Sequence, residues 1–281
     1  MKILRAEHLG MCFGVRDAIA LALAEASARP LTILGDLVHN DSVLAALRAR
    51  GIAVEQQAAS VKTGTVMLTA HGASDRARTE IRSLGLSVLD ATCPLVHVAH
   101  RAVSKLAREG YHPVIVGRRD HVEVRGLTED LDDFDVVLDA DDVMRLDEHP
   151  RFGVASQTTQ PIDRVHALVD LMRARFPGSD VRFVDTVCHP TKDRQSAAIA
   201  LARKCDVVIV VGGARSNNTH EIVNTCRRHC ARVHHVQTSL DLRLDWFAAD
   251  DIVGITAGTS TPAHVIDAVE QSICDSGEGS L

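Results

Sequence analysis

Residues 207–213 have the sequence Val207-Val-Ile-Val-Val-Gly-Gly213, and the polar stretch Ser216-Asn-Asn218 follows. An unbroken apolar run of this length suits a strand that is buried on both faces of a parallel sheet. Similar runs that end in polar loops recur at residues 31–34, 66–69, 87–90, 113–116, 181–184 and 252–256. Helical patterns lie between them, from Asn40 or Asp41 to Gly51 and from Ser74 to Gly85. This alternation predicts an α/β fold.

The composition is that of a globular protein with a large core. The chain has 281 residues, of which 46% are hydrophobic and 24% charged, and this length is typical of about two domains. The net charge of -6 gives no electrostatic footprint for nucleic acid, so we expect no such partner. No apolar stretch is long enough for a membrane span, and charged residues interrupt any signal-peptide core. We therefore expect a cytoplasmic protein with no membrane partner.

Three of the seven cysteines stand where a strand-like segment gives way to a helical pattern. They lie in Gly10-Met-Cys12-Phe-Gly14, Asp90-Ala-Thr-Cys93-Pro94 and Asp185-Thr-Val-Cys188-His-Pro190. The three are almost evenly spaced along the chain, which indicates three related units. Without an export signal, cysteines point to thiolate chemistry or to simple burial rather than to disulfides.

Polar residues repeat with the same rhythm. His39, His121 and Ser216 lie at nearly equal distances after Cys12, Cys93 and Cys188. Each unit then has a second polar strand end, marked by His71, Thr158 or Ser260. Ligands of open α/β sheets bind beyond the carboxyl ends of the strands. If the three units face a common centre, three thiolates and a ring of donors meet in one cavity. These donors suit a diphosphate: His39, His71, His121, Ser216, Asn217, Asn218 and Ser260.

Three cysteines are one short of the four thiolates that normally hold a four-iron cluster. An iron without a protein ligand is an open Lewis-acid site that could bind a substrate hydroxyl. For any one cysteine alone, burial as a small apolar residue is the simpler interpretation. Cys205, Cys226, Cys230 and Cys274 have no comparable setting. Cys226 and Cys230 could pair on a metal, but we expect them to be buried.

Glu123 is a candidate proton donor, because it follows His121 by two residues. If this segment is extended, both side chains point to the same face. The alternative is a structural ion pair with Arg118, Arg119 or Arg125.

Taken together, these segments resemble the IspH/LytB-type family of 4-hydroxy-3-methylbut-2-enyl diphosphate reductases. The matching text runs from end to end of the chain: Gly10-Met-Cys-Phe-Gly-Val-Arg-Asp-Ala-Ile19, Val38-His-Asn40, Ala70-His-Gly72, Asp90-Ala-Thr-Cys-Pro-Leu-Val96, Ser156-Gln-Thr-Thr159, Cys188 with Thr191 and Arg194-Gln195, Ser216-Asn-Asn218 and Gly254-Ile-Thr-Ala-Gly-Thr-Ser-Thr-Pro262. Two departures are visible. Better-known members have Gly-His-Pro-Glu at Asp120-His-Val-Glu123 and commonly Ser-Ser-Asn at Ser216-Asn-Asn218.

The resemblance implies a trefoil of three pseudo-symmetric α/β domains around a central iron–sulfur cluster. The domains would span residues 13–93, 94–187 and 188–281, joined by an N-terminal strand in residues 1–12. Cys12, Cys93 and Cys188 would hold a 4Fe-4S cluster in which one iron lacks a protein ligand. A ferredoxin or a flavodoxin would supply electrons.

The resemblance also implies roles for the polar residues. Thr158 would lie near the substrate hydroxyl, and Glu123 would deliver protons through Thr158 or the bound substrate. The diphosphate would be bound by His39, His71, His121, Ser216, Asn217, Asn218 and Ser260. Two electrons and two protons would then convert the allylic alcohol diphosphate into isopentenyl and dimethylallyl diphosphates and water.

Three other functions remain open on the sequence alone. A non-redox hydro-lyase could use a similar open-iron cluster, and a sensor could carry the cluster without turning a substrate over. A cluster-free α/β binding protein would contain neither iron nor sulfide.

Overall fold

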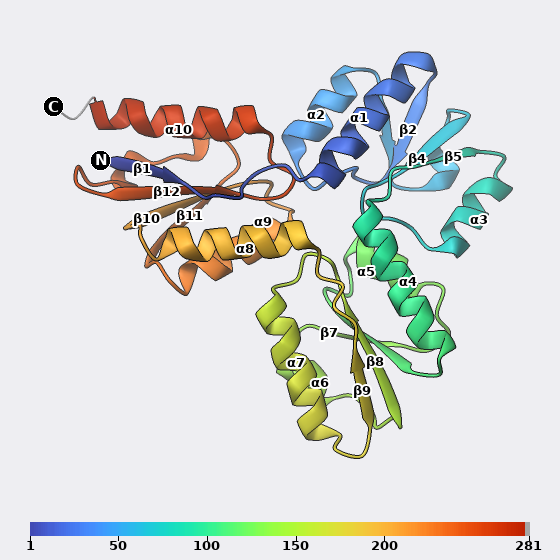
Figure 1. Ribbon diagram of the computed structural model, residues 1–281. Helices are drawn as coiled ribbons and strands as arrows, with labels where there is room; N and C mark the ends of the chain where they lie inside the picture. The colour runs from blue at the N-terminus through green and yellow to red at the C-terminus, as the bar shows by residue number, and fades with distance from the viewer. Residues whose placement is uncertain (279–281) are drawn as a thin grey trace. The chain divides into compact units, whose positions relative to one another are not determined.

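A computed structural model describes residues 1–278 and contains three sheets of four parallel strands each (Figure 1). The chain divides into two compact bodies. One comprises residues 1–16 and 39–45 and the chain from His189 onward, and it holds one sheet. The other comprises residues 17–38 and 46–188 and holds two sheets.

The sheet nearest the N-terminus in sequence has the strand order β3-β2-β4-β5. Its elements and the helices along the same stretch of chain are α1 (Phe13–Ala28), β2 (Leu31–Leu34), α2 (Asp41–Ala49), β3 (Ala53–Glu55), the 3₁₀ turn Ala58–Ser60, β4 (Thr65–Leu68), α3 (Asp75–Ser83) and β5 (Ser87–Asp90). Both helices expected here are confirmed. The side chains of Asn40 and Ser74 accept hydrogen bonds from the first turns of α2 and α3. Gly51 and Gly85, both at positive φ, follow the helix ends.

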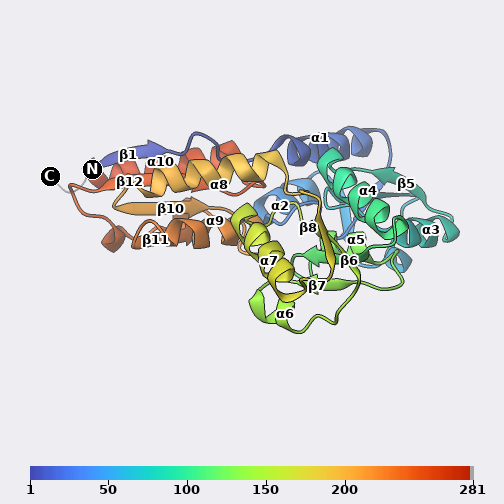
Figure 2. The ribbon, with the colours of Figure 1, turned by 60° about the horizontal axis from the view of Figure 1, so that its bottom comes forward.

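The middle sheet has the order β7-β6-β8-β9. Its elements are α4 (Pro94–Arg108), β6 (His112–Val116), α5 (Val122–Thr128), β7 (Asp135–Val137), α6 (Ala140–Met144), β8 (Arg151–Ser156), α7 (Ile162–Arg175) and β9 (Asp180–Phe183). On one face, Met172 of α7 packs with Phe152 and Val154 of β8. On the other, α4 and α5 pack against Ile115 and Ala155 (Figure 2).

The third sheet is built from both ends of the chain, in the order β11-β10-β12-β1. Its elements are β1 (Lys2–Arg5), α8 (His189–Ala202), β10 (Val207–Val211), α9 (Asn217–Arg227), β11 (Arg232–Val236), the 3₁₀ turns Ser239–Asp241 and Leu244–Trp246, β12 (Ile252–Ala257) and α10 (Ala263–Glu278). Strand β1 pairs with β12 in parallel. Helix α10 covers one face, and α8 and α9 cover the other (Figure 1).

All three sheets therefore share one topology, since β11-β10-β12-β1 repeats the arrangement of β3-β2-β4-β5 and β7-β6-β8-β9. In the first two sheets, the helices after the two inner strands lead to opposite edge strands. In the third, α9 leads from β10 to the edge strand β11, whereas the other edge strand, β1, comes from the start of the chain. The gap between the two inner strands is thus a topological switch point, where α/β sheets bind ligands. The α/β prediction is confirmed, and all seven predicted runs are strands. Among the described residues, no helix has the length and apolar character needed to cross a membrane.

A glycine in an inner strand lets a helix approach closely in two of the sheets. A Cβ atom at Gly153 of β8 would lie 2.9 Å from the Cβ atoms of Leu106 and Tyr111. The equivalent position in β12, Gly254, faces Leu201 of α8 and Cys205 in the same way. These contacts explain why glycine interrupts otherwise apolar strands.

Replacing Gly153 with alanine should therefore overpack the contact between α4 and β8. We expect Gly153→Ala to lower the free energy of unfolding by about 1–3 kcal/mol, measured by urea denaturation. Gly178→Ala is the matched control, because no atom lies within 4 Å of its added Cβ. Equal stabilities of the two variants would contradict the close approach.

Candidate active site

Each of the three predicted cysteines follows an edge strand and precedes a helix. Cys12 stands between β1 and α1, Cys93 between β5 and α4, and Cys188 between β9 and α8. Cys93 is the N-cap of α4, with Pro94 as the first helical residue. All three side chains are partly exposed.

A backbone hydrogen bond ties each cysteine to the loop after the neighbouring inner strand. The Cys12 N–H donates to the carbonyl of Thr259 at 3.0 Å. The N–H groups of Cys93 and Cys188 donate to the carbonyls of Ala70 at 3.1 Å and Thr158 at 3.0 Å. Thr158 is itself a predicted site residue, and the other two acceptors, Thr259 and Ala70, adjoin the predicted residues Ser260 and His71. Each sheet therefore holds its cysteine beside one of its own polar loops.

The other cysteines have different surroundings. Cys226 and Cys230 are buried, as expected, and lie in the apolar cluster between α8, α9 and β10. The Cys226 thiol points at the carbonyl of Ala198, and the Cys230 thiol points at the carbonyl of Cys205. Burial raises the pKa of Cys226 to about 12 and that of Cys205 to about 11. Protonated thiols of this kind are poor ligands for a metal.

A buried arginine holds the Cys12 loop in place. The Arg194 Nε donates to the carbonyl of Gly10 at 3.0 Å, and its Nη1 donates to the carbonyl of Pro190 at 2.9 Å. Gly10 itself adopts φ of 73°, which favours glycine. We did not predict this role for Arg194. The sequence shows only an arginine within a helical segment, and nothing in it marks the distant carbonyl of Gly10 as a partner.

The polar residues predicted to bind a ligand all follow inner strands. In sequence, β2, β4 and β6 lead to His39, His71 and His121, and β8, β10 and β12 lead to Thr158, Ser216 and Ser260. One body carries Cys12, His39, Ser216, Asn217, Asn218 and Ser260. The other carries Cys93, Cys188, His71, His121, Glu123 and Thr158. Each body thus contains cysteines and polar donors together.

In the first body, the start of α9 is a prepared anion site. Ser216 caps the helix by accepting a hydrogen bond from the Thr219 N–H at 3.3 Å, and Asn217 and Asn218 form the first turn. The Asn218 Nδ2 and the Ser260 Oγ are buried and have no hydrogen-bond partner among the described residues. Buried donors normally have partners, and a helix N-terminus favours negative charge. These two groups therefore suit an oxygen-rich anion.

The glycines after β10 and β12 make room for side chains and backbone of the same body. A Cβ atom at Gly212 would lie 2.4 Å from the Thr219 Oγ1, and one at Gly258 would lie 2.2 Å from it. A Cβ at Gly213 would lie 2.3 Å from the carbonyl oxygen of His39. These packing contacts explain why glycine occurs at both Gly212 and Gly213. Thr219, which we did not predict, packs against the glycines that follow the two inner strands, Gly212 and Gly258.

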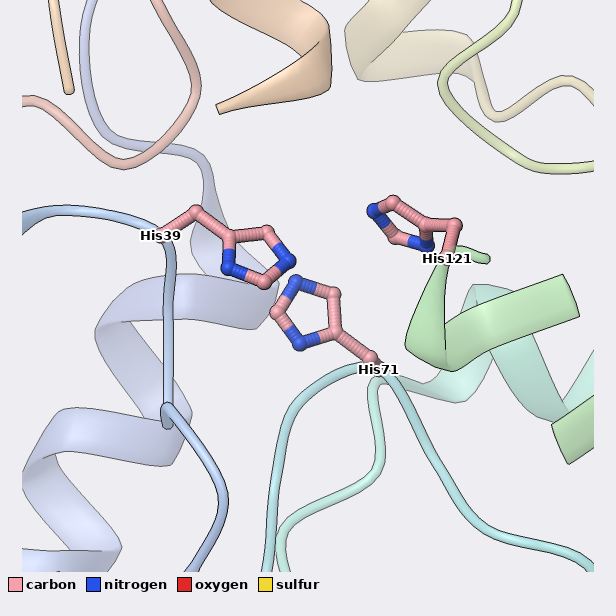
Figure 3. Close-up of side chains that lie close together, drawn as sticks. All are labelled: His39, His71 and His121. Atoms are coloured by element: carbon pink, nitrogen blue, oxygen red, sulfur yellow. The ribbon is translucent and has the colours of Figure 1, made fainter. Parts of the chain in front are cut away.

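In the second body, the rings of His71 and His121 lie edge to face with centroids 5.5 Å apart (Figure 3). The His121 Nδ1 accepts a hydrogen bond from the Glu123 N–H at 3.1 Å. Since Nδ1 is an acceptor, the ring proton belongs on Nε2, which can donate to a ligand. His39, the third ring labelled in Figure 3, belongs to the first body.

Two carboxylates at the end of α5 tie it to the loop that carries His71. The Ser74 Oγ donates to Glu129 at 2.6 Å. The N–H groups of Asp75 and Arg76 donate to the Asp130 carboxylate at 2.7 and 2.9 Å. The N-terminus of α3 is thus capped by α5, whose own N-terminus carries His121 and Glu123.

Glu123 is buried, with 1% of its surface exposed, and lies in the first turn of α5. The expectation of an extended segment was wrong, because the His121 side chain caps a helix there. The Glu123 Oε1 accepts a hydrogen bond from the Thr158 N–H at 2.7 Å. Burial raises the pKa of Glu123 to about 7, although the hydrogen bonds from Thr158 oppose the rise. Within residues 1–278, Glu123 forms no ion pair with Arg118, Arg119 or Arg125, so the structural alternative is wrong.

Comparison with known proteins shows the family to which the chain belongs. Residues 3–274 match the family described as LytB protein. This chain belongs to the LytB family. Two curated relatives are both called 4-hydroxy-3-methylbut-2-enyl diphosphate reductase. The one from Trichlorobacter lovleyi is 36% identical over 96% of each chain. The one from Geobacter sp. strain M21 is 37% identical over 96% of this chain and 95% of its own.

Solved structures agree with this assignment. The E-1-hydroxy-2-methyl-but-2-enyl-4-diphosphate reductase of Plasmodium falciparum superposes with a TM-score of 0.89 at 27% identity, over 96% of this chain and 87% of that one. A second structure, described as the terminal enzyme of the non-mevalonate pathway, superposes with a TM-score of 0.67 at 32% identity. It covers 98% of this chain and 99% of its own. The LytB fold is therefore shared along almost the whole chain.

The raised pKa of Glu123 has a measurable effect on stability. In the unfolded chain this carboxyl titrates near 4.5, and in the folded protein it titrates near 7. The folded state binds the extra proton between these values, so stability from this group falls as pH rises from about 4.5 through about 7. The difference corresponds to about 3 kcal/mol.

Glu123→Gln should remove this dependence. We expect the free energy of unfolding of the wild type, relative to the variant, to fall by about 3 kcal/mol between about pH 4.5 and pH 8. Urea denaturation across this range measures the difference. Parallel profiles for the two proteins would show that Glu123 is already ionised in the folded state at low pH.

Proposed function

We propose that this chain is a 4-hydroxy-3-methylbut-2-enyl diphosphate reductase, the terminal enzyme of the non-mevalonate isoprenoid pathway. The observation that carries this proposal is its similarity, along nearly its whole length, to curated reductases of that name. The repeated topology supports it independently, because each sheet presents one cysteine next to polar loops at its switch point. The reaction removes the hydroxyl of an allylic diphosphate with two electrons and two protons. It yields isopentenyl or dimethylallyl diphosphate and water.

Cys12, Cys93 and Cys188 would hold a 4Fe-4S cluster with one iron that lacks a protein ligand. Their chemistry fits this group, because all three are partly exposed, stand at helix starts and are not disulfide-bonded. When bound, such a cluster supplies electrons and a Lewis-acidic iron that assists departure of the hydroxyl. The domains would span residues 13–93, 94–187 and 188–281, so that Cys12 ends the N-terminal segment, Cys93 ends the first domain and Cys188 begins the third.

The diphosphate would be bound by the polar loops. His39, His71 and His121 would donate from imidazole nitrogens, and His121 would use Nε2–H because its Nδ1 accepts a hydrogen bond from the backbone. Ser216, Asn217, Asn218 and Ser260 would complete the site. The unpaired donors of Asn218 and Ser260 support this role, because an anion oxygen would satisfy both. The helix dipole of α9 adds to the attraction.

Glu123 would deliver protons, with Thr158 between it and the substrate hydroxyl. A carboxyl with a pKa of about 7 holds a proton at neutral pH and can still release it. The Thr158 N–H fixes the Glu123 carboxyl in one orientation. Because both side chains are buried, bulk water cannot replace them as a proton source.

The reductase would take its electrons from a ferredoxin or a flavodoxin and act in the cytoplasm. An anaerobic assay with a strong reductant and the allylic diphosphate tests the function. We expect consumption of two electrons for each isopentenyl or dimethylallyl diphosphate formed. Loss of water from the substrate without electron consumption would identify a hydro-lyase. A cluster spectrum that changes on substrate addition without turnover would identify a sensor.

In the same assay, Glu123→Gln should lower turnover by about 10²–10⁴-fold, the range typical of a lost general acid. The glutamine can still accept the Thr158 N–H, so cluster content and substrate affinity should stay close to wild type. The wild-type rate should fall as pH rises above about 7, since Glu123 then loses its proton. Unchanged turnover in the variant would remove Glu123 from the mechanism.

A further inference from the structure

A second cluster of potential ligands lies at the amino ends of the strands of the middle sheet, at the end of the sheet opposite the polar loops. His112 is the first residue of β6, Asp133 precedes β7 by two residues, and His149 precedes β8 by two residues. These three strands are neighbours in the sheet, in the order β7-β6-β8. The cluster therefore stands at their amino ends, whereas His121 and Thr158 follow the carboxyl ends of β6 and β8. It belongs to one compact body and takes no part in the proposed reaction.

The geometry of the cluster suits a metal ion. Each of the three residues offers a ligand atom, and these atoms all lie within 4.8 Å of one another. The His112 Nδ1 is 3.3 Å from the Asp133 carboxylate. Two ligands of a tetrahedral zinc ion, at about 2.0–2.1 Å from the metal, are separated by about 3.4 Å. His112 and Asp133 are thus already spaced as a ligand pair.

A further carboxylate orients His112. The His112 Nε2 is 2.9 Å from an oxygen of Asp135, and the His112 side chain is only 7% exposed. With its Nε2–H donated to Asp135, the ring turns Nδ1 toward Asp133 as a lone pair. A carboxylate behind a ligating imidazole is the usual supporting arrangement of zinc sites, because it fixes the tautomer and increases the basicity of the ligand.

His149 supplies the third ligand. Its ring stacks on His112, with centroids 3.7 Å apart and planes inclined by 13°. Neither of its ring nitrogens has a hydrogen-bond partner among the described residues. Nearly parallel rings cannot aim both lone pairs at one point, so metal binding requires the His149 ring to rotate. It lies in an irregular segment between α6 and β8, where such a rotation needs no change in a helix or strand.

A pocket of about 440 Å³ gives access to this cluster, and its wall also includes Asp132, Tyr111 and Arg151. The carboxylates of Asp132, Asp133 and Asp135 make the surroundings attractive to a cation. Arg151 is engaged elsewhere, because it stacks on Tyr111 and donates to the Glu109 carbonyl. Two imidazoles and one carboxylate with an open fourth position form a common ligand set for zinc.

We propose that His112, Asp133 and His149 bind a divalent transition-metal ion, with Zn²⁺ the best match. The ion joins the starts of three adjacent strands and so stabilises the middle sheet at the end opposite the polar loops. The competing state has no metal, with His112 lying directly between the carboxylates of Asp133 and Asp135.

Equilibrium dialysis of the anaerobically purified holoenzyme against micromolar Zn²⁺, followed by zinc-edge X-ray absorption, tests this site. We expect one zinc per chain beyond the cluster metal. Its neighbours should be nitrogen and oxygen at about 2.0–2.1 Å, with imidazole scattering and no sulfur at about 2.3 Å. Zinc should also raise the Tm of the wild type.

Variants of the carboxylates localise the ion. Asp133 is 78% exposed, so Asp133→Asn should leave the fold intact while abolishing both zinc binding and the shift in Tm. Asp135→Asn should weaken binding about 10–100-fold, as expected for a supporting carboxylate. Asp132→Asn is the matched control, because Asp132 lines the pocket without belonging to the cluster, and its effect should stay below about threefold.

Three results would overturn the proposal. The first is the absence of bound zinc in the wild type. The second is sulfur around the zinc, which would place the ion on cysteines. The third is an equal loss of affinity in Asp132→Asn and Asp133→Asn, which would reduce the effect to diffuse negative charge.

Discussion

Every strand in the three sheets runs parallel to its neighbours, and this polarity decides where chemistry can occur. In a parallel sheet the carboxyl ends of all strands lie at the same end of the sheet. Residues that follow the strands there are brought together from distant parts of the sequence. Because the strand order is shared, this end is alike in each sheet. The two inner strands lead to polar loops, and one of the edge strands leads to a cysteine. Three backbone hydrogen bonds, from Cys12, Cys93 and Cys188 to neighbouring loops, keep these parts in register.

The site departs from ordinary packing in ways that only a ligand compensates. A buried donor without a partner costs about 1–3 kcal/mol, and Asn218 and Ser260 each present one. Burial of Glu123 without a counter-charge keeps its carboxyl protonated near neutral pH. An anion that accepts from these donors would recover part of this free energy on binding. The same groups thus lower the stability of the free protein, and in the proposed function they would strengthen its binding of a diphosphate.

Much of this fold could be predicted from sequence, because the inner strands are buried on both faces and appear as continuous apolar runs. The strand at Val207–Val211 is the clearest case. The strands β3, β7 and β11 were not predicted. The first two have only three residues, and only Val233 and Val236 of the five residues of β11 are buried. Placing the Glu123 and His121 side chains on one face assumed an extended segment, but a cap from the His121 side chain starts a helix there instead.

The candidate site was predictable where residues repeat and not where contacts are distant. Cysteines at strand ends and the polar loops that follow them repeat three times, so their spacing revealed them. The hydrogen bond from Thr158 to Glu123 and those from Arg194 to the Cys12 loop join residues far apart in sequence. Nothing in the local pattern of residues marks such pairs. The contacts that position Glu123 and the Cys12 loop therefore required the structure.

The central claim is that Cys12, Cys93 and Cys188 hold one cluster with a single iron open to substrate. Mössbauer spectroscopy of anaerobically prepared, iron-57-labelled protein, with and without the allylic diphosphate, tests it most directly. The account predicts one iron site with a distinct signal that alone shifts when the substrate is added, and loss of the whole cluster in Cys93→Ser. Equivalent iron sites that ignore the substrate, or an intact cluster in Cys93→Ser, would contradict it.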